Sequence, residues 1–218
     1  LKSYRNQLSK NYVNDSKVTN ELVHEAYDRM QQEVRASHIL ILVDEGASPQ
    51  DTLKAYNKIL DIKKRLDAGE DFVTVAKQTS EDPSVKENNG DLGYFSAFRM
   101  VYPFENAAFK TNVGQVSKPF RTRFGYHIVK VVDKRANRGE VTVAHIMIVK
   151  PNVSDVAQQE KAKATIEDIY KKIQQGENFE SLAQQFSEDK SSAPKGGVLQ
   201  RFGSGQLSSE EFENVAFS

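Results

Sequence analysis

Three of the four histidines in this 218-residue sequence lie within apolar segments, where an imidazole can transfer protons, bind a metal ion or form a buried hydrogen bond. His38, His127 and His145 each alternate with aliphatic residues, which is the pattern of inward-facing positions on a strand. His24 lies in a polar segment instead and is expected at the surface. One histidine on an apolar face is most often a hydrogen-bonded core residue. With two such histidines in one domain, a structural role and a catalytic role are about equally supported.

A metal site is the first alternative for these histidines. His38, His127 and Asp82 would supply two imidazoles and one carboxylate. No short-spaced ligand pair such as His-x-x-x-His supports this alternative, so no metal is expected. The absence of cysteine excludes a thiolate zinc site, a thiol nucleophile and a disulfide framework.

Other catalytic and binding classes leave no signature. The sequence lacks the Gly-x-Ser-x-Gly turn of a serine hydrolase, and residues 90–93 lack the Gly-Lys-Ser/Thr ending of a phosphate-binding loop. Its 30 basic and 30 acidic side chains give no net charge, which argues against a nucleic-acid binder. No apolar run approaches the roughly 20 residues that cross a bilayer, and no signal peptide is recognisable after Leu1.

The sequence repeats itself over a long interval. Segments 36–41, 69–72 and 80–82 recur 107 positions later, and segment 104–109 recurs 108 positions later. A constant offset over this span indicates two tandem copies of one domain. A solenoid is excluded, because its repeat unit is much shorter than 107 residues.

The elements that must position the candidate residues can be placed coarsely. Apolar residues at helical spacing predict helices over 19–33, 48–68, 72–78 and 103–110. Apolar runs predict strands over 34–43 and 126–134, and the stretch 80–90 is expected to be a loop. Strands and helices without regular alternation favour the α+β class. We therefore expect a helical segment over 1–33, a complete domain over 34–136 and a second copy over 140–218.

Five segments and one methionine follow one another in a recognisable order: 36–40 (ASHIL), 80–84 (SEDPS), 89–95 (NGDLGYF), Met100, 104–109 (FENAAF) and 122–128 (TRFGYHI). Together they resemble the parvulin family of peptidyl-prolyl cis/trans isomerases. The resemblance implies a parvulin-like (FKBP-like) antiparallel sheet flanked by helices, in tandem, with an N-terminal helical segment. This arrangement is similar to the periplasmic chaperone-isomerases that escort outer-membrane proteins.

The resemblance also implies a site. His38 and His127 would form a pair at its floor. Asp82 falls where family members carry Asp or Cys, and Thr122 aligns with the polar residue linked to the histidines.

The implied walls of the site are apolar. The residues that would take the proline ring and support it are Leu92, Phe95, Met100, Phe104 and Phe124. Phe98 departs from the glycine that the family usually has in the turn before Met100, which changes the rim of the pocket.

By this resemblance the chain is an enzyme that isomerises X-Pro bonds in unfolded or folding proteins of the periplasm or cell envelope. No cofactor and no nucleic-acid partner are implied. Some parvulins select phosphorylated Ser/Thr-Pro with a basic cluster after the first strand, but loop 44–51 is acidic and contains no Lys or Arg. No phosphate specificity is therefore expected. The alternative function is a non-catalytic chaperone module that binds unfolded chains through the same groove.

The second copy carries only part of the pattern. Matching positions are occupied by His145, Asp189, Leu199, Leu207 and Phe212. The Gly-Asp-Leu-Gly stretch is replaced there, and the counterpart of His127 would fall beyond position 218, so this copy is expected to be inactive. Without its closing strand it would expose a sheet edge. We therefore expect it to be disordered, domain-swapped in a self-association, or completed by residues outside this chain.

Overall fold

A computed structural model describes residues 19–149, 151–152, 154–207 and 209–218. The chain divides into two compact units: Leu1–Gly139 with Ser204–Glu210, and Glu140–Gly203 with Glu211–Ser218. The first 18 residues of the predicted helical segment lie outside the described residues. The domain boundaries at 34–136 and 140–218 stay a prediction. Among the described residues, no helix combines the length and the apolar character that a bilayer crossing requires.

Two helices of unit 1 begin at side-chain caps that are visible in the sequence. Helix α2 (Asn20–Met30) begins after Thr19, whose hydroxyl accepts the backbone N–H of Leu22 at 3.2 Å. Helix α3 (Pro49–Asp67) begins after Ser48 and has proline in its first turn. A cap side chain satisfies one of the backbone donors that a helix start leaves unpaired. The predicted helix over 48–68 is confirmed, whereas α2 ends earlier than the predicted position 33.

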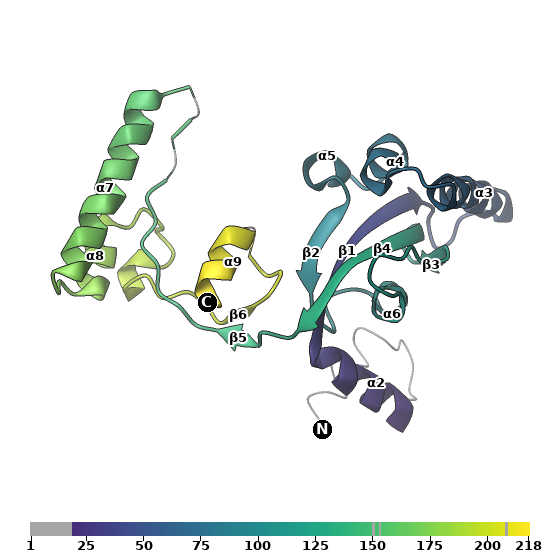
Figure 1. The fold of residues 1–218 in the computed structure, drawn as a ribbon, viewed down its shortest axis with the longest axis horizontal. Helices are drawn as coiled ribbons and strands as arrows, with labels where there is room; N and C mark the ends of the chain where they lie inside the picture. Colours follow the sequence, from purple (N-terminus) through teal and green to yellow (C-terminus); the bar gives the residue numbers. More distant parts are fainter. Residues whose placement is uncertain (1–18, 150, 153, 208) are drawn as a thin grey trace. The chain divides into compact units, whose positions relative to one another are not determined.

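A four-stranded antiparallel sheet forms the centre of unit 1 (Figure 1). Its order is β2-β1-β4-β3, with bounds Asp91–Phe95, Gln32–Leu42, Gly125–Ala136 and Phe120–Thr122. The long strands β1 and β4 are central and pair over their whole length. This antiparallel sheet flanked by helices confirms the predicted α+β class.

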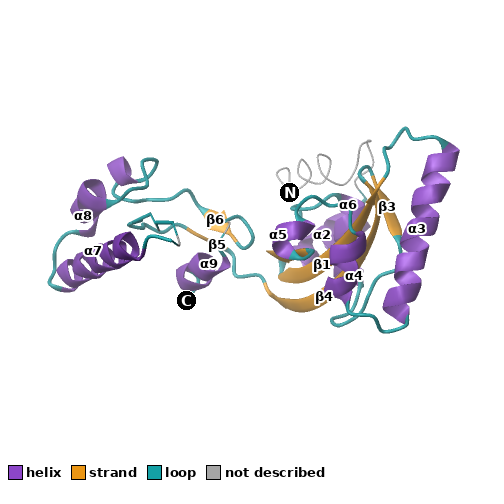
Figure 2. Cartoon of the chain, turned by 90° about the horizontal axis from the view of Figure 1, so that it is seen from above, coloured by secondary structure: helices purple, strands orange, loops and turns teal. Residues whose placement is uncertain are grey.

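Helices cover both faces of this sheet, as Figure 2 shows from above. One core joins Ile39, Ile41 and Ile128 to helices α3, α4 (Phe72–Thr79) and α5 (Val85–Asn88). The second core lies on the opposite face, because alternate strand residues point to opposite sides. It joins Ala36, Val129 and Val131 to α6 (Tyr102–Lys110). The prediction of a loop over 80–90 is wrong at α5, a single turn too short to give a helical pattern.

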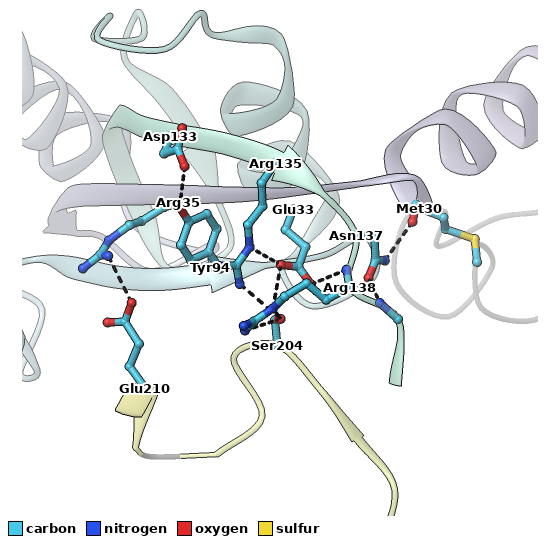
Figure 3. A network of polar contacts seen from close by, with 11 residues as sticks. Met30, Glu33, Arg35, Tyr94, Asp133, Arg135, Asn137, Arg138, Ser204 and Glu210 are labelled. Carbon is cyan, nitrogen blue, oxygen red and sulfur yellow. Dashed lines mark hydrogen bonds and ion pairs between the residues drawn. The ribbon is translucent and has the colours of Figure 1, made fainter. Parts of the chain in front are cut away.

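One end of β1 and β4 is fixed by a buried acid. Glu33 is fully buried and accepts a hydrogen bond from Arg135 Nε at 2.6 Å. Arg135 and Arg138 also donate to the hydroxyl of Ser204, in the segment Ser204–Glu210 of the same unit (Figure 3). A buried carboxylate requires such partners, since an unpaired charge in the interior is costly.

Unit 2 contains fewer strand pairs. Its elements are β5 (Glu140–Val141), α7 (Val156–Gln174), α8 (Phe179–Phe186), η1 (Ala193–Lys195), β6 (Phe202–Gly203) and α9, which begins at Glu210 and ends at Ala216. The segment 143–149 corresponds to β1 in the repeat but forms only one isolated bridge, between Ala144 and Val198. The prediction of a paired strand around His145 is therefore wrong. The described part of unit 2 has no counterpart of β4, and a strand needs a neighbouring backbone to pair with.

Candidate active site

The two histidines of the predicted site lie side by side on the α6 face of the sheet. His38 on β1 is opposite Val129 of β4, and His127 on β4 is opposite Leu40 of β1. This register makes the two histidines diagonal neighbours on one face. Their ring centroids are 5.7 Å apart with an interplanar angle of 20°, and both residues are at most 5% exposed.

Asp82 holds one end of this pair. Its Oδ2 lies 2.7 Å from His38 Nε2, while its Oδ1 accepts both the backbone N–H and the hydroxyl of Ser84 at 2.8 Å. Burial opposes ionisation of Asp82, but the hydrogen bonds from Ser84 and the contact with His38 together lower its pKa. Burial also lowers the pKa of His38, against the opposing effect of Asp82. His38 is therefore a neutral imidazole that donates its Nε2 proton to the Asp82 carboxylate.

Thr122 holds the other end. Its hydroxyl oxygen lies 2.8 Å from His127 Nε2 and accepts the backbone N–H of Phe124 at 3.1 Å. Burial, followed by the neighbouring His38, lowers the pKa of His127 to about 3. The Nδ1 atoms of both histidines are buried and have no hydrogen-bond partner in the structure. Near neutral pH the floor is thus polar and uncharged between Asp82 and Thr122.

The predicted metal alternative has no support in this geometry. Asp82 contacts His38, whereas His127 contacts Thr122. Within the described ranges, no group of three or more histidine, aspartate or glutamate side chains could hold a metal ion.

Aromatic and aliphatic side chains surround the histidine pair. The Phe104 ring from α6 meets both imidazoles edge-on, with centroids 5.5 Å from each. Leu92 and Met100 pack against the core that contains Phe95 and Phe104. A cavity beside these two side chains is lined by Leu92, Tyr94, Phe95, Arg99, Met100, Gly205 and Gln206. The structure therefore gathers four of the five predicted wall residues in one apolar cluster.

The last predicted wall residue, Phe124, is exposed, and Phe120 contributes a ring to the site in its place. The ring of Phe124 is 47% exposed and lies 4.7 Å from the Arg123 guanidinium, so its main link to the site is its N–H bond to Thr122. Phe120 was not predicted, yet its ring stacks on His127 with a centroid distance of 5.5 Å and an angle of 14°. Phe120 precedes Thr122 by two residues, and this spacing places both on the same face of a strand.

A glycine lets the chain approach behind His38. The backbone N–H of His38 donates to Gly90 O at 2.9 Å, and Gly90 has a φ of +84°. A Cβ at this position would lie 2.8 Å from the His38 carbonyl oxygen, closer than real Cβ contacts. Only glycine fits both the left-handed backbone and this close approach.

Unit 2 keeps one half of the constellation. His145 Nε2 lies 2.8 Å from Asp189 Oδ2, and its ring meets Phe212 edge-on at 5.6 Å. Hydrogen bonds from Ser191 and neighbouring groups lower the pKa of Asp189. Leu207, the predicted counterpart of Met100, lies in the segment Ser204–Glu210, which belongs to unit 1. The inactivity of the second copy stays a prediction.

Comparison with known proteins identifies the class of domain. The family model described as "PPIC-type PPIASE domain" matches residues 21–135 and again residues 132–218. The two matches cover nearly the whole chain. This chain therefore belongs to the PPIC-type peptidyl-prolyl isomerase family, the parvulins, and the resemblance stated from the sequence is confirmed.

Particular relatives carry foldase and chaperone names. Foldase protein PrsA of Geobacillus kaustophilus is 43% identical over 126 residues, which are 58% of this chain and 41% of that protein. Chaperone SurA of Pseudomonas savastanoi pv. phaseolicola is 37% identical over 177 residues, 78% of this chain and 40% of that protein. The chain thus spans about two fifths of the length of these relatives. A crystal structure of PrsA from Bacillus anthracis shares 34% identity, covers 70% of this chain and 57% of its own, and superposes with a TM-score of 0.42.

Proposed function

We propose that this chain isomerises X-Pro peptide bonds in unfolded or folding polypeptides, and that the site around His38 and His127 carries the activity. The observation behind the proposal is the buried, uncharged histidine pair between Asp82 and Thr122, with Phe104 edge-on to both rings. The identity to proteins named foldase and chaperone supports polypeptide clients.

The reaction itself requires no nucleophile. Rotation about a peptide bond has a barrier of roughly 18–20 kcal/mol, because resonance gives the C–N bond double-bond character. Before proline the two isomers are close in energy, yet they exchange over tens of seconds or more. At the twisted transition state the carbonyl is less polarised and the nitrogen recovers its lone pair. An environment of low polarity therefore favours the twisted amide over the planar one.

The chain's own residues can provide that preference. Leu92, Met100 and Phe104 would hold the proline ring while the preceding carbonyl turns, so that the twisted form is bound better than the planar form. His38 and His127 would line the path of that carbonyl as neutral imidazoles. Asp82 and Thr122 would fix the orientation of the two rings.

We propose further that the site does not select phosphorylated substrates. The segment 44–51, which runs from the end of β1 into the first turn of α3, carries Asp44, Glu45 and Asp51, and its sequence contains no Lys or Arg. Arg121 reaches this loop but donates to the backbone carbonyl of Asp44 at 3.0 Å. A dianionic phosphate would meet net negative charge at the loop.

The second candidate is a chaperone module that holds unfolded chains without isomerising them. It requires the apolar wall but gives no role to the imidazole pair, so we favour the enzyme. We propose in addition that the clients are proteins of the cell envelope and that the second copy mediates self-association.

One coupled assay tests the proposal. Refolding of a proline-limited substrate is followed together with its light scattering, in the presence of the full chain. Faster refolding that is lost in His127→Ala supports the enzyme. Suppressed scattering with an unchanged refolding rate would contradict it and favour the chaperone module.

A further inference from the structure

Phe98 has a backbone conformation that its side chain disfavours. Its φ is +68°, and within the described residues only Asn89 shares a positive φ among non-glycine residues. Asparagine tolerates the left-handed region, but a bulky residue with a Cβ is strained there. Phe98 lies in the turn between β2 and α6, two residues before the pocket residue Met100. The surrounding structure must therefore hold this turn in place.

The buried carboxylate of Glu105 supplies that restraint. Its Oε2 accepts the backbone N–H of Phe98 at 2.8 Å. Glu105 is fully buried on α6 and directly follows Phe104, whose ring contacts both histidines. One turn of α6 thus carries both a wall of the pocket and the acceptor for the turn before Met100.

Helix α2 holds the other oxygen of the same carboxylate. Arg29 Nη1 lies 3.2 Å from Glu105 Oε1, and Arg29 is itself only 4% exposed. Arg29 also donates to Glu25 at 2.6 Å and to Asn106 at 2.8 Å. Burial raises the pKa of Glu105 to about 8, against the hydrogen bond from Phe98. The Phe98 N–H lies on one oxygen of this buried carboxyl group and the Arg29 guanidinium on the other, so the side chain is held from both ends.

The repeat shows the same turn with a different residue. Position 205 corresponds to Phe98 at the offset of 107, and it is a glycine with a φ of +74°. Glu213, the counterpart of Glu105, is also buried, at 4% exposure. Glycine adopts this conformation without strain. The first copy thus has a strained residue where the second copy has a permissive one.

We propose that Glu105 is a positioning residue for the proline pocket, which holds Phe98 in the left-handed turn that aims Met100 at the substrate. Arg29 of α2 acts behind it by holding the carboxylate. This inference rests on the proposed isomerase function and deepens it. It also makes α2 part of the working domain, since a domain that began at residue 34 would lack Arg29.

A double-mutant cycle on the full chain tests this inference. The variants are Glu105→Leu, Phe98→Gly and the double variant, with Glu213→Leu as the matched control in unit 2. We expect Glu105→Leu to lower kcat/KM about tenfold, because the turn loses its buried hydrogen-bond acceptor. Phe98→Gly in that background should restore most of the activity, because glycine holds the turn without the bond. Glu213→Leu should leave kcat/KM within about twofold of wild type. Additive effects, or no recovery with Phe98→Gly, would overturn the role of Glu105.

A substitute variant and an NMR measurement separate failure of this inference from failure of the proposed function. If Glu105→Leu does not fold, Glu105→Ala, which also lacks an acceptor for the Phe98 N–H, replaces it in the same cycle. The Met100 methyl resonance is recorded by NMR in every variant; it should shift when Glu105 is replaced and return with Phe98→Gly. A wild-type chain without isomerase activity would refute the proposed function, and the methyl resonance would still decide the role of Glu105. A Met100 resonance that does not move in the Glu105 variants would refute the positioning role alone.

Discussion

Asp82 and His38 lie 2.7 Å apart, Oδ2 to Nε2, and join the loop before α5 to the centre of β1. Ser84 donates two hydrogen bonds to the other carboxylate oxygen, so both oxygens of Asp82 have a hydrogen-bond partner. This arrangement fixes which nitrogen of His38 carries the proton. The consequences can be tested at Asp82, at His127, at Met100 and with the choice of substrate.

Asp82→Asn should lower kcat/KM for an X-Pro peptide by about tenfold, because the amide accepts a weaker hydrogen bond than the carboxylate and no longer fixes the His38 tautomer. A protease-coupled isomerase assay measures this. Asp189→Asn is the matched control, since Asp189 makes the same contact with His145 at 2.8 Å in unit 2. Equal losses in both variants would contradict the assignment of the site to unit 1.

Removal of the His127 imidazole should make the free energy of unfolding depend less on pH below neutrality. The folded pKa of His127 is about 3, below the unfolded value near 6.5. Its contribution to stability is therefore present above about pH 6.5 and is lost as the pH falls toward 3, because the unfolded chain binds the proton first. Between pH 7 and pH 4, wild type should lose roughly 3 kcal/mol more unfolding free energy than His127→Asn. Urea denaturation at both pH values measures the difference, and parallel profiles would refute the burial of a neutral His127.

Met100→Ala should lower kcat/KM by about tenfold, since one wall of the pocket loses its contact with the proline ring. Met100 is only partly buried, so the unfolding free energy should change less than for a core residue. The exposed Lys54→Ala is the control. An equal effect of the two substitutions on kcat/KM would exclude Met100 from the pocket.

Phosphorylation of the residue before proline should not improve the substrate. Paired peptides with Ser-Pro and phosphoserine-Pro are compared for kcat/KM at low salt, where charge effects are largest. We expect the phosphorylated peptide to be the poorer substrate, because loop 44–51 is acidic. A strong preference for the phosphopeptide would show that Arg121 or another cation binds the phosphate in spite of this loop.

Local patterns in the sequence were sufficient for much of unit 1. The helix starts at Thr19 and Ser48 follow from capping chemistry, and the inward faces of β1 and β4 follow from alternation. Ordered motifs brought His38, Asp82, Thr122 and His127 into one hypothesis, and the structure places them as two hydrogen-bonded pairs whose imidazole rings stack on each other. These features depend on neighbours along the chain or on residue order, which a sequence records directly.

Other features exist only through contacts between distant segments. The pairing of β1 with β4 decides that His38 and His127 are diagonal neighbours. The pairing of β3 with β4 places Phe120 opposite His127, where the two rings stack. Segment 143–149 resembles β1 in sequence but forms no ladder, because a strand is completed by a partner's backbone and not by its own residues. The sequence by itself determined which residues could form the site. The tertiary structure decided which of them meet, since burial, register and the contact of Glu105 with Phe98 are set by packing across the fold.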